Sequence, residues 1–366
     1  MKDEDDDERD ELEVYPTDNL IVVAKTQDEI SQLEIYVYDQ SQENLFVHHD
    51  LMLPNFPLCL EWLDFPPATS SSSAINSNTS GFGNYIAVGT LDPEIEIWSL
   101  DVLEAMYPTS ILGRPDVTKA HVPVPSGTGK KKKKKSKHRQ TETAYHVDAV
   151  LGLSWNKTQR NLLASASADR TVKLWDLTRD PASQGDGSGA IRSFDLHKDK
   201  VQAVQWNEKE PTVLLTGSYD RTVRTFDSRA PTTGVGAVVG SDVEALKWDP
   251  WDPYGFYVRI YCSPFSSFSY AFPQVSLENG IVLNFDVRTL PSDLENPSQP
   301  KFTLAAHDGA ASAIDVNPHL KGCIVTGGTD KLVKVWNIND EDKNKRNISL
   351  VTSRDLGVVS VKLHSF

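Results

Sequence analysis

Three histidines stand at the same distance from three aspartates, and a hydroxyl side chain accompanies each pair. The spacing is 23 residues in all three pairs, which are His146–Asp169, His197–Asp220 and His307–Asp330. Histidine, aspartate and serine together can perform nucleophilic hydrolysis, in which the histidine takes the hydroxyl proton. A catalytic triad is needed once, however, whereas this set recurs at a fixed spacing. The repetition therefore predicts a structural network, and we expect the chain not to be an enzyme.

Each predicted network joins groups that satisfy one another's hydrogen bonds. The carboxylate accepts from one histidine nitrogen, the other nitrogen contacts the hydroxyl, and that hydroxyl accepts from an indole N–H. A buried chain of this kind leaves no polar atom unpaired and fixes the local geometry. In the unit of His197 the aromatic is Phe226, which has no donor, so this network should lack its last link. The predicted members are His146, Ser165, Asp169, Trp175, His197, Thr216, Asp220, His307, Thr326, Asp330 and Trp336.

The elements that position these residues are short antiparallel strands. In each unit a small-residue strand leads to a turn at the aspartate, and an alternating strand then ends in an aromatic residue six positions later. These units resemble WD repeats, with the Trp-Asp dipeptide intact at Trp175–Asp176. The resemblance implies a β-propeller, usually of seven four-stranded blades around a channel. We expect blades near residues 18–53, 57–101, 146–178, 197–229, 241–288 and 307–338, with a fragment from about 349.

The predicted fold is therefore all-β, a seven-bladed WD-repeat β-propeller with an incomplete last blade, over residues 16–366. Two further segments are predicted around and within it. Residues 1–15 are expected to be an acidic disordered tail, and residues 104–145 a disordered basic loop. The tail is either simply solvated or contacts basic proteins such as histones, or the lysines of the loop.

A second landmark lies 14 residues before the aspartate in the three regular units, at Trp155, Trp206 and Val316, and it exposes an insertion. The corresponding interval from Trp248 to Asn279 is 31 residues. We place the excess at 258–274, which is apolar and aromatic, and hypothesise that it is a retained in-frame intron. Deleting it would join Tyr257 to Val275 and restore an ordinary strand. The alternative is a functional apolar binding loop.

A run of basic residues is the strongest charged feature of the chain. Like charges repel and no apolar periodicity accompanies them, so this run should project from the propeller. Such runs suit nuclear import receptors or nucleic-acid phosphates, and the alternative is a merely solvated loop. The residues assigned to this basic loop are Lys130, Lys131, Lys132, Lys133, Lys134, Lys135, Lys137 and Arg139.

Composition narrows the class of protein further. The formal net charge is −14, and no apolar run is long enough to span a membrane. The three cysteines are scattered, without the spacing of a metal site or a disulfide framework. We therefore expect a nuclear or cytosolic protein with no cofactor, no bound metal, no membrane association and no small-molecule substrate.

Several segments together resemble one WD-repeat family more closely. They include Pro16-Thr-Asp-Asn-Leu-Ile-Val, Phe46-Val-His-His-Asp50, Asn84-Tyr-Ile-Ala-Val-Gly89 and the lysine run. Together they are similar to the periodic tryptophan protein family, first type, over essentially the whole chain. That family has a longer acidic N-terminal region and completes a last blade beyond Gly357. The resemblance implies a nuclear and nucleolar scaffold that binds pre-ribosomal or chromatin proteins, in ribosome biogenesis or chromatin-linked ribosomal-RNA transcription.

A second functional reading rests on two arginines. Phe226-Asp-Ser-Arg229 and Phe285-Asp-Val-Arg288 resemble the Asp-x-Arg ending of substrate receptors of cullin-type ubiquitin ligases. In such receptors this arginine contacts the adaptor, so Arg229 and Arg288 are possible adaptor contacts. An arginine after a terminal strand is also a common surface feature, which leaves both interpretations open.

Overall fold

The regular secondary structure of the described residues is almost entirely β-strand. We analysed a computed structural model, which describes residues 19–68, 81–103, 105–113, 144–179, 189–261, 280–294, 298–309, 311–342 and 345–355. The acidic residues 1–15 and the basic residues from Lys130 to Arg139 lie outside these ranges. No helix within the described ranges is long and apolar enough to cross a membrane.

The strands form six antiparallel sheets, each built from strands that follow one another in the chain. The first sheet has three strands, β1 Asn19–Gln27, β2 Ile30–Asp39 and β3 Asn44–Leu53. The second sheet contains β4 Pro57–Leu63, β5 Tyr85–Thr90, β6 Ile95–Ser99 and β7 Ser110–Leu112. The third contains β8 Val150–Trp155, β9 Leu162–Ser167, β10 Val172–Asp176 and β11 Arg192–Phe194. The fourth contains β12 Val201–Trp206, β13 Val213–Ser218, β14 Thr222–Asp227 and β15 Ala230–Val238.

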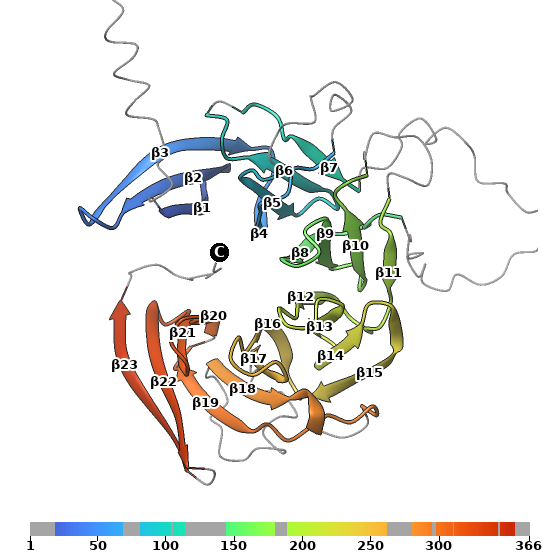
Figure 1. The fold of residues 1–366 in the computed structure, drawn as a ribbon, viewed down its shortest axis with the longest axis vertical. Coiled ribbons are helices and arrows are strands. Elements are labelled where there is room, and N and C mark those ends of the chain that lie inside the picture. Colours follow the sequence, from blue (N-terminus) through green and yellow to red (C-terminus); the bar gives the residue numbers. More distant parts are fainter. Residues whose placement is uncertain are drawn as a thin grey trace, which may run out of the picture.

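The last two sheets complete the arrangement around a common centre. The fifth sheet contains β16 Asp242–Trp248, β17 Gly255–Tyr261, β18 Gly280–Asp286 and β19 Phe302–His307. The sixth contains β20 Ala311–Val316, β21 Cys323–Gly328, β22 Leu332–Asp342 and β23 Lys345–Asp355. A short 3-10 helix, η3 Val287–Thr289, follows β18. Figure 1 shows the sheets in chain order around the centre, with β4, β8, β12, β16 and β20 as the inner strands. This is the architecture of a β-propeller.

The number of sheets corrects the sequence-based prediction. The described residues form six blades, where seven were expected. The fragment from about 349 was assigned to a further blade, but Lys345–Asp355 is β23, the outer strand of the sixth sheet. The repeat pattern ends at the aromatic residue of the third strand, so it gives no signal for the outer strand that follows. Residues from Gly357, expected to begin a further blade, lie outside the described ranges.

Two other predicted boundaries also move. The basic loop was predicted over 104–145, but Ser110–Leu112 form β7 and pair with β6. A three-residue edge strand is too short to show a period in the sequence. The predicted insertion at 258–274 begins inside β17, because Val258 to Tyr261 continue that strand alongside β16. The rest of that insertion lies outside the described ranges.

Turns at the predicted aspartates close the hairpins between the second and third strands. The residue after the aspartate adopts a left-handed conformation in three sheets, with φ of 72° at Arg170, 67° at Arg221 and 66° at Lys331. A non-glycine residue tolerates this conformation where local hydrogen bonds hold it. In the third sheet Asp169 provides such bonds, because its Oδ1 accepts from the N–H and hydroxyl of Thr171.

The hydrophobic core lies between neighbouring sheets, and close approach of the inner strands makes it compact. Leu163 and Trp175 of the third sheet pack with Ile95 and Ala87 of the second. Small residues on the inner strands permit this approach. A Cβ added to Gly152 in β8 would lie 3.0 Å from the backbone oxygen of Gln202 in β12. Side-chain volume at this place would therefore push neighbouring blades apart.

Candidate functional site

The first predicted network is fully assembled in the third sheet. His146 Nδ1 lies 2.9 Å from Asp169 Oδ2, and His146 Nε2 lies 2.7 Å from Ser165 Oγ. Trp175 Nε1 donates to the same hydroxyl at 2.8 Å. Since the hydroxyl oxygen accepts from the indole, its proton is available to His146 Nε2, which makes Nδ1 the protonated nitrogen. Each polar group of the set thus has a partner.

The other two networks reproduce this arrangement with a predictable difference. His307 lies 2.8 Å from Thr326 Oγ1 through Nε2 and 3.0 Å from Asp330 through Nδ1, and Trp336 donates to the threonine at 2.9 Å. In the unit with Phe226 the indole donor is missing. There His197 Nδ1 is 3.0 Å from Asp220 Oδ2 and Nε2 is 2.9 Å from Thr216 Oγ1, whose other neighbour is the backbone oxygen of Arg224 at 3.3 Å.

Burial closes these three sets to substrates. Ser165, Thr216 and Thr326 are 0% exposed, so no substrate can reach their hydroxyls. Burial lowers the pKa of His146, which keeps the ring neutral. Burial alone would raise the pKa of Asp169, but hydrogen bonds from His146 and Thr171 outweigh it and leave that pKa below its usual value. An ionised aspartate facing a neutral histidine is a stable structural pair.

Two sheets without a matching histidine use another device, which the sequence reasoning missed. In the second sheet Trp98 Nε1 donates to Glu96 Oε2 at 3.0 Å, and in the first sheet the Tyr36 hydroxyl donates to Glu34 Oε2 at 2.8 Å. Both glutamates are buried, two residues before the aromatic on the same strand. The signal was present in the sequence as a glutamate inside an apolar strand.

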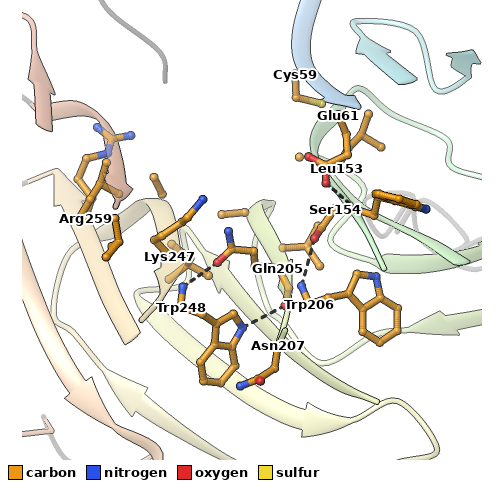
Figure 2. A pocket seen from close by; sticks show the side chains of 18 of the residues that line it. Cys59, Glu61, Leu153, Ser154, Gln205, Trp206, Asn207, Lys247, Trp248 and Arg259 are labelled. Atoms are coloured by element: carbon orange, nitrogen blue, oxygen red, sulfur yellow. Dashed lines mark hydrogen bonds between the residues drawn. The ribbon is translucent and has the colours of Figure 1, made fainter. Parts of the chain in front are cut away.

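The inner strands line a pocket of about 440 Å³ near the centre of the propeller (Figure 2). Its walls carry a series of hydrogen bonds from one inner strand to the next. The N–H of Trp155 donates to Glu61 Oε1 at 2.7 Å, and the N–H of Trp206 donates to Ser154 Oγ at 3.1 Å. The N–H of Trp248 donates to Gln205 Oε1 at 2.8 Å. We call this series the inner ladder.

The inner ladder changes character between β16 and β20. The residue at the ladder position of β16 is Lys247, which has no acceptor atom. Its Nζ instead pairs with Asp315 Oδ1 of β20 at 2.8 Å. The sequence reasoning missed all of these residues, although each one directly precedes the landmark that was used to measure the repeats.

Two ionisable groups in the pocket have shifted pKa values. Burial raises the pKa of Glu61 to about 7, although the N–H of Trp155 partly opposes this shift. Burial lowers the pKa of Arg259 to about 10, and its partner Glu244 opposes that shift from 3.4 Å. Figure 2 shows Glu61 and Arg259 on different sides of the pocket. The described residues contain no group of three or more side chains suited to a metal ion.

The two arginines of the alternative reading lie on neighbouring sheets and are exposed. Arg229 follows β14 and Arg288 follows β18, with side chains 70% and 59% exposed. Each guanidinium is held by the aspartate two residues earlier, at 2.6 Å from Asp227 Oδ2 and 2.6 Å from Asp286 Oδ2. The ring of Tyr254 also lies beneath Arg288, at 4.6 Å. Both arginines are thus presented in a fixed orientation.

Comparison with known proteins agrees with the repeat geometry. The family "WD domain, G-beta repeat" matches residues 138–176, 189–227 and 298–337. An uncharacterized WD repeat-containing protein of Schizosaccharomyces pombe is 40% identical over 100% of this chain and 60% of its own length. Periodic tryptophan protein 1 of Saccharomyces cerevisiae is 35% identical over 98% of this chain and 61% of its own. The chain is a WD-repeat protein similar to periodic tryptophan protein 1.

A homologue of that protein in Drosophila melanogaster is 30% identical over 93% of this chain and 62% of its own length. The chain therefore spans about 60% of the length of these relatives. WD-repeat propellers and proteins of this kind generally act as scaffolds without catalytic activity. The protein partners of this chain are a matter of proposal.

Proposed function

We propose that this protein is a non-enzymatic scaffold of the nucleus and nucleolus. In this role it binds pre-ribosomal or chromatin proteins during ribosome biogenesis or chromatin-linked ribosomal-RNA transcription. The observation that carries the proposal is that the three Ser/Thr-His-Asp sets are sealed inside the blades as repeated structural networks. The similarity to periodic tryptophan protein 1 supports the cellular role.

The basic loop supports the proposed location. Six consecutive lysines, Lys130 to Lys135, are followed by Lys137 and Arg139. A cluster of this size attracts acidic surfaces such as those of nuclear import receptors, and it also attracts nucleic-acid phosphates. Import is the role we assign to it, with RNA or DNA contact as an accompanying function.

Replacing Lys130 to Lys135 with glutamine tests this assignment in cells. We expect the fluorescently tagged full chain to concentrate in the nucleolus and the variant to become largely cytoplasmic. A matched control replaces Lys198 and Lys209, two exposed lysines on the propeller, with glutamine. The proposal fails if the unaltered chain stays in the cytoplasm, or if the control relocates it as strongly as the loop variant.

A second candidate function is favoured by the presentation of Arg229 and Arg288. Two exposed, pre-oriented guanidinium groups on consecutive sheets suit contact with the adaptor of a cullin-type ubiquitin ligase. Purified adaptor should then bind the chain, and Arg229→Ala with Arg288→Ala should abolish binding. Arg179→Ala is the matched control, since Arg179 is an exposed arginine near Asp176 on another sheet. Absence of binding by the unaltered chain removes this candidate.

A further inference from the structure

The turns that follow the inner strands β8, β12, β16 and β20 share one geometry. In each turn an asparagine or aspartate accepts, through its side-chain oxygen, the N–H of the residue two positions later. The four acceptors are Asn156, Asn207, Asp249 and Asn317. In the third and fourth sheets the exposed residues that follow the acceptor, 157–159 and 208–210, are all polar. This turn can therefore be formed without apolar side chains.

The corresponding turns of the fifth and sixth sheets expose large apolar side chains instead. Trp251 is 42% exposed and Tyr254 is 45% exposed between β16 and β17, and Leu320 is 61% exposed between β20 and β21. The indole N–H of Trp251 donates to the backbone oxygen of Asn317 at 3.0 Å. This bond joins the two turns, which belong to neighbouring sheets (Figure 1), and it holds the indole against the turn that carries Leu320.

The link between the turns does not require an indole. From the third to the fourth sheet, Asn156 Nδ2 donates to the backbone oxygen of Pro211 at 2.7 Å. From the fourth to the fifth, Asn207 Nδ2 donates to the backbone oxygen of Pro253 at 3.0 Å. A side-chain amide is thus sufficient for this link, and the exposed ring surface is additional to it. Exposed apolar side chains on adjacent turns are typical of a surface that binds a partner.

Cationic groups border these side chains. The guanidinium carbon of Arg288 lies 4.6 Å from the ring centre of Tyr254, and the Arg288 side chain is 59% exposed, whereas that of Asp286 is 5% exposed. Asp286 accepts two of the five side-chain N–H groups of Arg288, so three remain without a partner among the described residues. Lys321, next to Leu320, is exposed and pairs with no described carboxylate. We call Trp251, Tyr254, Arg288, Leu320 and Lys321 the turn patch.

We propose that the turn patch binds an acidic segment of a partner protein that also carries aliphatic or aromatic side chains. Asp252 lies in the same turn as Trp251, but Lys301 pairs with it at 3.4 Å and offsets its charge. The exposed donors of Arg288 favour a carboxylate, and Trp251 and Leu320 favour an apolar side chain beside it. Trp251 and Arg288 are already held in place, which lowers the entropy cost of binding. This assignment rests on the proposed scaffold role, because the ligand is a protein.

Binding of a short fluorescein-labelled peptide that alternates leucine with aspartate tests the proposal. Fluorescence anisotropy measures its affinity for the purified full chain. We expect Leu320→Ser and Arg288→Gln each to weaken binding at least about fivefold. Leu91→Ser is the matched control for the leucine, since Leu91 is 60% exposed in a turn at the opposite end of the strands. Arg179→Gln, at an exposed arginine of another sheet, is the control for the charge.

Two further peptides separate the apolar contribution from the charged one. The first has serine in place of leucine, and the second has lysine in place of aspartate. Each should bind the unaltered chain at least about fivefold more weakly than the first peptide, because each lacks one of the two features that the turn patch matches. Thermal unfolding checks that the variants of the chain remain folded.

Absence of saturable binding would overturn the proposal, as would an equal loss of affinity in Leu91→Ser and Leu320→Ser, or equal binding of the lysine peptide. Competition by oligouridine as strong as that by unlabelled peptide would assign the turn patch to RNA. Self-association that is lost in Leu320→Ser would assign it to a second copy of the chain. Peptide binding is measured apart from nucleolar location, so a failure of the proposed cellular role is distinguishable from a failure of this site.

Discussion

At the scale of single residues, the buried histidines act as neutral connectors between a turn and a strand. His146 links the turn residue Asp169 to Ser165 of β9, and its ring is 0% exposed. Protonating the ring would bury an additional charge and place a second proton where the serine now donates. The network therefore depends on the hydroxyl, which is the one group that both accepts from the indole and donates to the imidazole.

The hydroxyl should matter more where an indole also uses it. Thr326→Val leaves both His307 Nε2 and Trp336 Nε1 without a partner, whereas Thr216→Val leaves only His197 Nε2. We expect Thr326→Val to lower the free energy of unfolding by about 2–4 kcal/mol and Thr216→Val by about 1–2 kcal/mol. Urea denaturation of the two variants measures this difference. Equal losses would show that the indole bond adds nothing.

The carboxyl of Glu61 should make stability depend on pH. Burial raises its pKa from 4.5 to about 7, so the folded state prefers the protonated form. The resulting stability is fully present below about pH 4.5 and is lost as the pH rises through about 7. Glu61→Gln removes this loss, and Gln205 already performs the same task two sheets away.

We therefore expect Glu61→Gln to raise the free energy of unfolding by roughly 2 kcal/mol at pH 8 and to change it little at pH 5. Thermal or urea unfolding of the variant and the unaltered chain at the two pH values measures the effect. The same gain at both pH values would mean that titration of Glu61 is not its origin.

At the scale of elements, β17 differs from the second strand of every other four-stranded sheet. In the other four-stranded sheets, a small residue of the inner strand lies opposite a glycine or alanine of the second strand. These pairs are Cys59–Gly89, Gly152–Ala166, Ala203–Gly217 and Ala313–Gly327. In β17 the paired residue is Arg259, whose side chain is 6% exposed. Its Nε has no hydrogen-bond partner among the described residues. A buried guanidinium is unfavourable at a position that holds glycine or alanine in the other sheets.

Deleting residues 258–274 should remove the unfavourable burial of Arg259 from this strand, as expected if the segment is a retained intron. The deletion moves Ser276 to the position of Arg259 and Asn279 to the position of the turn aspartate. We expect the midpoint of thermal unfolding to rise by at least about 2 °C. A control deletion of residues 69–80, the serine-rich segment that lies between β4 and β5 in the sequence, should leave the midpoint nearly unchanged. A lower midpoint after the first deletion would favour a functional loop, and alignment of transcript with genomic DNA tests the intron itself.

At the scale of the whole molecule, the sequence predicted repeats better than it predicted their number. The spacing of His307, Asp330 and Trp336 located a sheet, because each residue is fixed by contacts inside one repeat. Outer strands such as β7 and β23 pair along one edge only, and their sequences carry little pattern. The pocket and the inner ladder arise between repeats, so a comparison of repeats with one another did not reveal them.

The sheets should also differ in how readily they open. The first sheet has three strands, and most residues of β1 are exposed, whereas the third and fourth sheets are packed on both faces. We expect amide hydrogen exchange in β1 to be at least about 100-fold faster than in β9 and β13. Exchange mass spectrometry of the full chain measures this difference. Uniform protection would indicate that the ring opens as a single unit.

The inner ladder also limits which substitutions a lineage can accept. A lysine at one step cannot receive the N–H of the next strand, and in this chain an acid at the following step takes up its charge. Replacing Lys247 alone by a neutral acceptor would leave Asp315 with less positive charge nearby. Replacing Asp315 alone would remove the carboxylate with which Lys247 pairs. Among related propellers these two positions should consequently change together, so that their joint variation marks neighbouring blades more clearly than either position does alone.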